Sequence, residues 1–186
     1  MEKLHIIFMA RMVREKGAHI VVEAANILRK EFEGRIDFWL CGGLSNNPNG
    51  ISEEELRSWC DGDYLQWLGH RSDVKELLQQ SSIVVFPSYY HEGLPKSLIE
   101  ATAIGRPIIT TDSVGCRDTV EDGFNGFLIP IKNANALADK LRLLIDNREL
   151  RIEMGRNSRI IAERDFSIED VVSKHLEIYH RLSPKK

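Results

Sequence analysis

Two glutamates with seven residues between them, Glu92 and Glu100, frame the stretch of the chain whose residue types could do chemistry. Gly93 lets the backbone approach a ligand closely. Pro95 suits the first turn of a helix that ends before a glycine at position 105. The backbone N–H groups of the next two residues would then be unpaired at the positive end of the helix, where phosphate oxygens bind well. The pattern therefore predicts a site for a phosphorylated ligand.

Glu100 has two interpretations. Between Pro95 and Gly105, Lys96 and Glu100 are the charged residues, and a helix that is apolar nearly all round is expected to be buried. Burying an unpaired carboxylate is costly, so Glu100 needs a partner. That partner is either a ligand with hydroxyl groups, such as the two hydroxyls of a ribose, or the solvent or a nearby arginine.

Arg11 and Lys16 follow the first apolar run of the chain, KLHIIFMA. Fixed cations lower the barrier of a reaction in which negative charge develops on a leaving diphosphate. The planar fork of arginine suits phosphate in particular. The alternative is ordinary surface charge, but the position directly after a strand favours a role in the site.

These residues must be positioned by alternating strands and helices. Apolar runs predict strands at 3–10, 35–41, 64–68, 83–86, 107–111 and 126–130. Helices are expected at 17–32, 53–60, 73–80 with Ser72 as its cap, 95–105, 134–146, 149–164 and 168–182. The alternation predicts an α/β fold, a doubly wound Rossmann-like parallel sheet of about six strands with helices on both faces. Such sheets bind ligands at the carboxyl ends of their strands, where every candidate residue falls.

Composition narrows the function classes. The chain has 186 residues, which suits one domain, and a formal net charge of −3, which gives no basic excess for nucleic acid. No apolar run is long enough for a transmembrane helix. Three widely spaced cysteines, Cys41, Cys60 and Cys116, indicate reduced thiols in a cytoplasmic protein. We expect no metal site and no cofactor.

Four elements together resemble one enzyme family. They are EGLPKSLIEATAIGRPIITTD at 92–112, GCRD at 115–118, EDGFNGFLIP at 121–130, and Arg11, Lys16 and Gly17 in an R-x4-KG pattern. In order and spacing they resemble the retaining glycosyltransferases of the E-x7-E family, of the family 4, group 1 type with the two-domain GT-B architecture. The resemblance covers nearly the whole chain.

The resemblance implies a role for each matching residue. Residues 1–186 would be the nucleotide-sugar (donor) domain, the C-terminal half of a GT-B fold, with the N-terminal acceptor domain absent from this chain. Arg11 and Lys16 would neutralise the leaving diphosphate, and Glu92 would contact hydroxyls of the transferred sugar. The donor-binding residues would be Gly69 and His70 near the base, Gly93, Leu94 and Pro95 along the sugar and diphosphate, Lys96 and Ser97 at the phosphates, and Glu100 at the ribose.

Pro95 departs from many relatives, which have glycine or another N–H-bearing residue at that place, and this puts the sugar contact in doubt. Positive side chains and the helix end can replace a metal cation at the diphosphate, and we identify no Asp-x-Asp triplet of the kind that metal-dependent glycosyltransferases use.

By resemblance, the enzyme transfers a sugar with retention of configuration from a nucleotide-diphosphate sugar to a glycan or polyprenyl-diphosphate-linked acceptor. The donor would be a UDP-N-acetylhexosamine or a UDP-hexose, and the pathway would be bacterial surface polysaccharide synthesis. The isolated chain would be inactive, and the full-length enzyme would be cytoplasmic or peripheral to the inner membrane.

Two other classes were weighed. A non-catalytic nucleotide-sugar-binding module is disfavoured by intact Arg11, Lys16, Glu92 and Glu100. A Rossmann oxidoreductase would need G-x-G-x-x-G after the first strand, and the sequence ARMVREKG lacks it.

Overall fold

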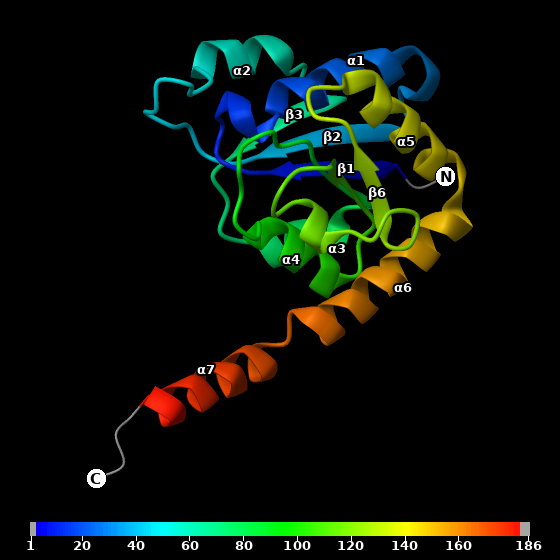
Figure 1. Ribbon diagram of the computed structural model, residues 1–186. Coiled ribbons are helices and arrows are strands. Elements are labelled where there is room, and N and C mark those ends of the chain that lie inside the picture. The colour runs from blue at the N-terminus through cyan, green and yellow to red at the C-terminus, as the bar shows by residue number, and fades with distance from the viewer. Residues whose placement is uncertain (1–2, 183–186) are drawn as a thin grey trace.

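The computed structural model describes residues 3–182, except for the side chain of residue 170. Its centre is a six-stranded parallel sheet with the order β3-β2-β1-β4-β5-β6 (Figure 1). The strands are β1 (Leu4–Met9), β2 (Ile36–Cys41), β3 (Leu65–Gly69), β4 (Ile83–Phe86), β5 (Ile108–Thr111) and β6 (Gly126–Ile129). All six predicted strands are present, and the doubly wound α/β fold is confirmed.

Helices cover both faces of the sheet. One layer contains α1 (Ala18–Phe32), α2 (Glu53–Trp59) and α5 (Ala134–Asp146), and the other contains α3 (Val74–Gln80), α4 (Lys96–Ile104) and α6 (Arg148–Asp165) (Figure 1). Within the layers α1 packs against α5, and α4 packs against α6. Short 3₁₀ turns, η1 (Arg14–Lys16) and η2 (Arg117–Thr119), follow β1 and β5.

Burial explains why the central strands read as unbroken apolar runs. All four residues of β4 are buried, and so are all four of β5, because helices cover both sides of the sheet there. Helix α1 instead buries one stripe, which includes Ile20, Val21 and Leu28. These residues belong to one continuous hydrophobic core that extends over both faces of the sheet.

Side chains cap the N-termini of α2, α5 and α6. Ser52, Asn133 and Asn147 accept hydrogen bonds from the N–H groups of Glu55, Ala136 and Leu150, which are otherwise unpaired. The predicted cap at Ser72 is wrong. Helix α3 begins one residue later, with Asp73 at the N-cap position, and the Asp73 carboxylate pairs with Arg71 at 2.5 Å instead of capping the helix.

Helix α4 also differs from expectation. We expected it to be buried nearly all round, but its buried residues are Leu98, Ala101 and Thr102. Helix α6 covers one side and α3 touches another, which leaves Lys96 exposed and Glu100 partly exposed. The helix begins after Pro95 and ends at Gly105 in the left-handed conformation, as the sequence predicts.

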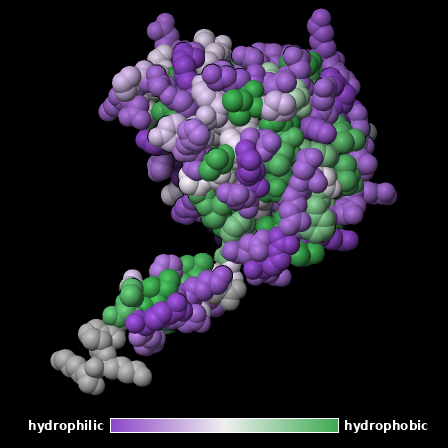
Figure 2. Space-filling model, viewed as in Figure 1, coloured by the Kyte–Doolittle hydropathy of each residue, from purple (hydrophilic) through white to green (hydrophobic). Residues whose placement is uncertain are grey.

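The last helix, α7 (Ile168–Leu182), projects away from the rest of the molecule (Figure 1). Its described side chains are exposed, including those of Ile168, Val171, Val172 and Leu176, which follow one another at helical spacing. The space-filling view shows a hydrophobic strip along it (Figure 2). Helix α7 therefore adds nothing to the core described above.

Candidate functional site

The sheet order places the site between β1 and β4. Strands β2 and β3 extend to one side of β1, and β5 and β6 extend to the other side of β4. In a doubly wound sheet, this change of direction opens a crevice at the carboxyl ends of the strands. Lys16 comes shortly after β1 and Glu92 shortly after β4, so both belong to the two loops that border the crevice.

Lys16 and Glu92 form an ion pair across this crevice. Lys16 Nζ donates to Glu92 Oε1, and both side chains are largely buried, with 16% and 11% of their surfaces exposed. Lys16 Nζ also lies 5.8 Å from the ring centre of Phe86 and 5.4 Å from that of Tyr90. The aromatic rings add to the cation's stabilisation. The sequence predicted both residues for the site but not that they would pair.

Ser88, which the sequence analysis missed, supports this pair. It is fully buried, and its Oγ lies 2.9 Å from Glu92 Oε1 and 3.1 Å from the carbonyl oxygen of Glu15, so it can donate to either. The N–H of Tyr89 donates to the same carbonyl at 2.9 Å. The loop after β4 is thereby fastened to η1. A serine directly after a buried strand, on the binding edge of the sheet, is the signal that could have identified it.

Gly17 allows the two loops to come this close. Its φ is +87°, and a Cβ added there would lie 2.3 Å from the carbonyl oxygen of Pro87. A side chain at this position would force apart η1 and the end of β4. The glycine of the Lys16–Gly17 pair is thus explained by contact between backbones.

A cavity of about 290 Å³ adjoins the pair and is lined by Arg11, Lys16, Asn47, Asn49 and Tyr90, among others. Arg11 is exposed, and its side chain makes no hydrogen bond or ion pair with any residue the structure describes. It is therefore available to an anion. The loop that carries Asn47 and Asn49 follows β2, and the sequence did not single it out.

The start of α4 borders the same crevice. Pro95 is its N-cap, and no side chain caps the helix. The N–H groups of Leu98 and Ile99 donate back to Pro95 O at 3.0 and 3.2 Å, whereas those of Lys96 and Ser97 have no partner among residues 3–182. Such groups at a helix N-terminus suit phosphate oxygens.

The GCRD segment supports this loop from behind. A Cβ on Gly115, whose φ is +81°, would lie 1.7 Å from the carbonyl oxygen of Gly93 and 2.6 Å from that of Glu92. The backbone of Gly115 therefore packs directly against the loop. Gly93 and Leu94 themselves are exposed.

Glu100 is not in the cavity that Arg11 and Lys16 line. It pairs with Lys96 at 3.4 Å, with 35% of its side chain exposed, and it lines a separate hollow of about 220 Å³ between α3 and α4. In this ligand-free structure Glu100 pairs with a basic side chain, which is one of the two interpretations that the sequence allows. The partner is a lysine one turn away and not an arginine.

Gly69 and His70 also end up apart from the ion pair. Gly69 closes β3 with a φ of +67°, its carbonyl oxygen accepts a hydrogen bond from Gly42 N at 2.8 Å, and His70 is exposed. Strand β3 is at the edge of the sheet, two strands from β1. Both residues lie at the carboxyl ends of the strands, as predicted, but neither lines the cavity with Arg11.

Asp61 and Asp63 form an Asp-x-Asp triplet by spacing, which the sequence analysis overlooked. The triplet precedes β3 and so lies at the opposite edge of the sheet from Lys16 and Glu92. Asp61 Oδ1 accepts from the N–H groups of Asp63, Tyr64 and Leu65, and Asp63 pairs with Lys3 at 2.8 Å. The triplet shapes a turn. Within residues 3–182 no group of three or more His, Cys, Asp or Glu side chains is placed to hold a metal ion.

Comparison with known proteins identifies the family. The model of the glycosyl transferases group 1 family matches residues 1–160. The chain belongs to this family. A relative from Campylobacter jejuni, N,N'-diacetylbacillosaminyl-diphospho-undecaprenol alpha-1,3-N-acetylgalactosaminyltransferase, is 34% identical over 92% of this chain and 46% of its own length. The capsular polysaccharide biosynthesis glycosyltransferase CapM of Staphylococcus aureus is 30% identical over 86% of this chain and 41% of its own length.

Solved structures agree with this assignment. The S. aureus TarM G117R mutant, in complex with Fondaparinux, alpha-GlcNAc-glycerol and UDP, superposes with a TM-score of 0.83 at 27% identity, over 95% of this chain and 35% of that one. The chain thus spans less than half the length of these group 1 glycosyltransferases. In the described part of the chain, no helix has the length and apolar character needed to cross a bilayer.

Proposed function

We propose that this chain is the donor domain of a retaining glycosyltransferase that takes its sugar from a UDP-N-acetylhexosamine or a UDP-hexose. The observation that carries the proposal is the convergence of Lys16, Glu92 and the uncapped start of α4 at the crevice between β1 and β4. The acceptor would be a glycan or lipid-linked glycan. The names of the C. jejuni and S. aureus relatives, which mention a diphospho-undecaprenol acceptor and capsule synthesis, support this class.

The cations would act on the diphosphate. As the bond from the anomeric carbon to phosphate breaks, negative charge grows on the leaving group. Arg11, Lys16 and the N–H groups of Lys96 and Ser97 are fixed positive groups on the edge of the sheet where that charge would develop. Gly93, Leu94 and Pro95 would lie along the sugar and diphosphate, and Gly69 and His70 would lie near the base.

The two glutamates would act on hydroxyl groups, Glu92 on the sugar and Glu100 on the ribose. Each has a lysine partner in the ligand-free chain, Lys16 and Lys96 respectively. Donor binding would therefore exchange partners: phosphate oxygens take over Lys16 while Glu92 turns to sugar hydroxyls. This exchange keeps both ions paired before and after binding, which avoids an unpaired buried charge.

A second domain would complete the enzyme. The crevice described here is open on one side, and a site that excludes water from the reacting atoms needs a facing surface. The proposed acceptor domain would supply that surface. We expect the isolated chain to bind donor weakly and to transfer no sugar, and robust turnover on a lipid-linked acceptor would contradict this part of the proposal.

Isothermal titration calorimetry with UDP and with UDP-N-acetylglucosamine tests the assignment. Glu100→Gln should weaken UDP binding by about tenfold or more, since a hydrogen bond to a charged group contributes roughly 1.5–3 kcal/mol. Glu92→Gln should not weaken UDP binding; we expect about a fivefold gain, because separating a cation from its carboxylate partner costs roughly 1 kcal/mol. It should also abolish the difference in affinity between UDP-sugar and UDP.

Glu153→Gln provides the control, because Glu153 is an exposed glutamate on α6. Addition of EDTA should leave all affinities unchanged if the protein's own cations hold the diphosphate. Equal losses of UDP affinity in the Glu92 and Glu100 variants, or binding that needs magnesium, would contradict the proposed roles.

A further inference from the structure

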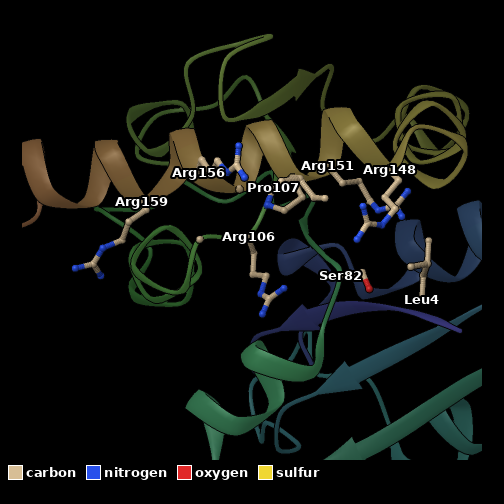
Figure 3. A pocket seen from close by; sticks show the side chains of 11 residues that line it. Leu4, Ser82, Arg106, Pro107, Arg148, Arg151, Arg156 and Arg159 are labelled. Atoms are coloured by element: carbon tan, nitrogen blue, oxygen red, sulfur yellow. The ribbon is translucent and has the colours of Figure 1, made fainter. Parts of the chain in front are cut away.

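A second hollow lies at the opposite edge of the sheet from the donor crevice. It has a volume of about 500 Å³ and is bordered by the amino ends of β1, β4 and β5 and by α6 (Figure 3). Five arginines line it, and none of the residues that line it is an aspartate or a glutamate, although Glu163 pairs with one of the arginines, Arg159, at 2.8 Å. The five arginines are Arg106, Arg148, Arg151, Arg156 and Arg159.

Three of these arginines have structural partners. Arg106 donates to Gln79 O at 2.7 Å, Arg151 donates to Leu144 O and Ile145 O at 2.5 and 2.9 Å, and Arg159 donates to Ala103 O at 2.8 Å. These carbonyls belong to the last turns of α3, α5 and α4, where backbone oxygens are unpaired and the helix dipole is negative. Capping occupies one terminal nitrogen of each of these three arginines, which leaves the other nitrogens of Arg151 without a partner among the described residues. The side chains of Arg148 and Arg156 make no hydrogen bond or ion pair with residues 3–182.

Arg148 has an unfavourable position for folding. It is the first residue of α6, where the positive end of the helix dipole repels a cation. Figure 3 shows its guanidinium beside that of Arg151, with Ser82 below both in this view. Burial lowers the pKa of Arg151 and the charge of Arg148 lowers it further, while the charge of Asp146 acts in the opposite direction. The nearby carboxylate of Asp146 is engaged at 2.9 Å by Arg35.

Two adjacent cations, a hydroxyl without a partner in the described chain and a hollow without carboxylates together describe the lining of an anion site. We propose that Arg148, Arg151 and Ser82 bind a phosphate group. Two planar guanidinium forks suit the oxygens of a tetrahedral dianion, and the serine hydroxyl can donate a third hydrogen bond. The ligand class is a phosphomonoester or a diphosphate, which a soluble molecule or a lipid headgroup could present.

This site is separate from the donor crevice and does not depend on the proposed function. Arg148, Arg151 and Ser82 lie at or near the amino ends of strands, whereas Arg11, Lys16 and Glu92 follow the carboxyl ends of β1 and β4. The length of a strand therefore separates the two sites. A ligand could occupy each of them at the same time.

Calorimetry with inorganic pyrophosphate tests the soluble form of the ligand. The titration uses a Lys16→Gln background, which weakens pyrophosphate binding in the donor crevice. Arg148→Gln in that background should reduce the remaining affinity about tenfold, as expected for a lost charge-assisted hydrogen bond. Arg57→Gln is the matched control, because Arg57 is an exposed arginine on α2. The melting temperature of Arg148→Gln should not fall, and should rise slightly, since Arg148 caps no helix and its charge opposes the dipole of α6.

Vesicle flotation tests the lipid form. Vesicles of phosphatidylcholine with phosphatidic acid are compared with vesicles of phosphatidylcholine alone. Loss of flotation in Arg148→Gln but not in Arg57→Gln, with no pyrophosphate binding, supports a lipid phosphate. Loss of pyrophosphate binding in the same variant supports a soluble ligand. If Arg148→Gln changes neither measurement, the proposal is wrong.

Discussion

Ser88 links the two loops of the crevice between β1 and β4 through a single hydroxyl. It is within hydrogen-bond distance of both Glu92 Oε1 and Glu15 O, and its own carbonyl oxygen accepts a hydrogen bond from Thr111 Oγ1 at the end of β5. Because it is fully buried, water cannot replace these contacts. The position of the Glu92 carboxylate therefore depends on this serine.

Ser88→Ala should lower the free energy of unfolding by about 1–2 kcal/mol, because a buried acceptor loses its donor. It should also weaken binding of UDP-sugar more than binding of UDP, since Glu92 would no longer be held in place. Ser81→Ala is a matched control. Ser81 is equally buried and donates to Leu78 O at 2.9 Å, but it lies at the end of α3. Chemical denaturation and calorimetry on both variants check the prediction, and identical changes in binding would contradict it.

For single residues, the sequence predicted where a side chain lies better than which side chains it contacts. Arg11, Lys16 and Glu92 could be assigned to one crevice because each follows a strand that the apolar runs predict. Lys16 and Glu92 are 76 positions apart in the sequence, and their pairing also depends on Ser88, whose role no local pattern reveals. The surroundings of Glu100 could not be predicted either. Its lysine partner is one turn away on the same helix, but its exposure depends on how α3 and α4 pack.

The junction of η1 with α1 tolerates little change in its geometry. Gly17→Ala should destabilise the fold by about 2–5 kcal/mol, of which roughly 1–2 kcal/mol is the cost of a left-handed residue and the rest is the clash with Pro87 O. Gly62→Ala isolates the first part, because Gly62 has a φ of +84° and no atom within 4 Å of an added Cβ. Urea denaturation should show the larger loss in Gly17→Ala. Equal losses would mean that η1 moves away from β4 without cost.

The turn before β3 should carry a pH-dependent part of the stability. Burial acts to raise the pKa of Asp61, but the N–H groups of Leu65 and Asp63 and the guanidinium of Arg29 outweigh it and lower the pKa to about 2. The carboxylate therefore stabilises the fold above its ordinary pKa of 3.8, and this contribution is lost as the pH falls toward about 2. Asp61→Ala should be less stable than wild type at pH 7, and the difference should shrink below pH 4. Urea titrations from pH 7 to pH 2.5 measure it, and a constant difference would contradict it.

Element boundaries were predictable where sequence chemistry acts locally. Pro95 and Gly105 limit α4 as predicted, because a proline start and a glycine end require nothing from the rest of the fold. Ser72 failed as a cap because Asp73 next to it pairs with Arg71, which shifts the start of α3. The partial exposure of α4 could not be predicted either, because its apolar composition does not show how much of its surface α6 and α3 cover.

At the scale of the molecule, α7 should be dispensable for the stability of the sheet. A chain that ends at Ser167 should unfold within about 2 °C of the full chain, because less than about 1 kcal/mol is removed with a helix that buries no core residue. Differential scanning calorimetry checks this. A loss of more than about 4 °C would show that α7 packs against the body of the molecule in solution. The amount of helix seen by circular dichroism should fall in the shortened chain.

The position of β1 in the middle of the sheet has a consequence for the order in which the molecule assembles as it is synthesised. Strands β1, β2 and β3 are neighbours made from consecutive segments, so half of the sheet can form while the remainder is still being translated. Helix α1 covers that half, but its own packing partner is α5, which emerges more than 100 residues later. We therefore expect the nascent chain to expose one side of α1 for most of its synthesis. Contacts between α1 and α5 should then form late, with low φ-values in refolding experiments.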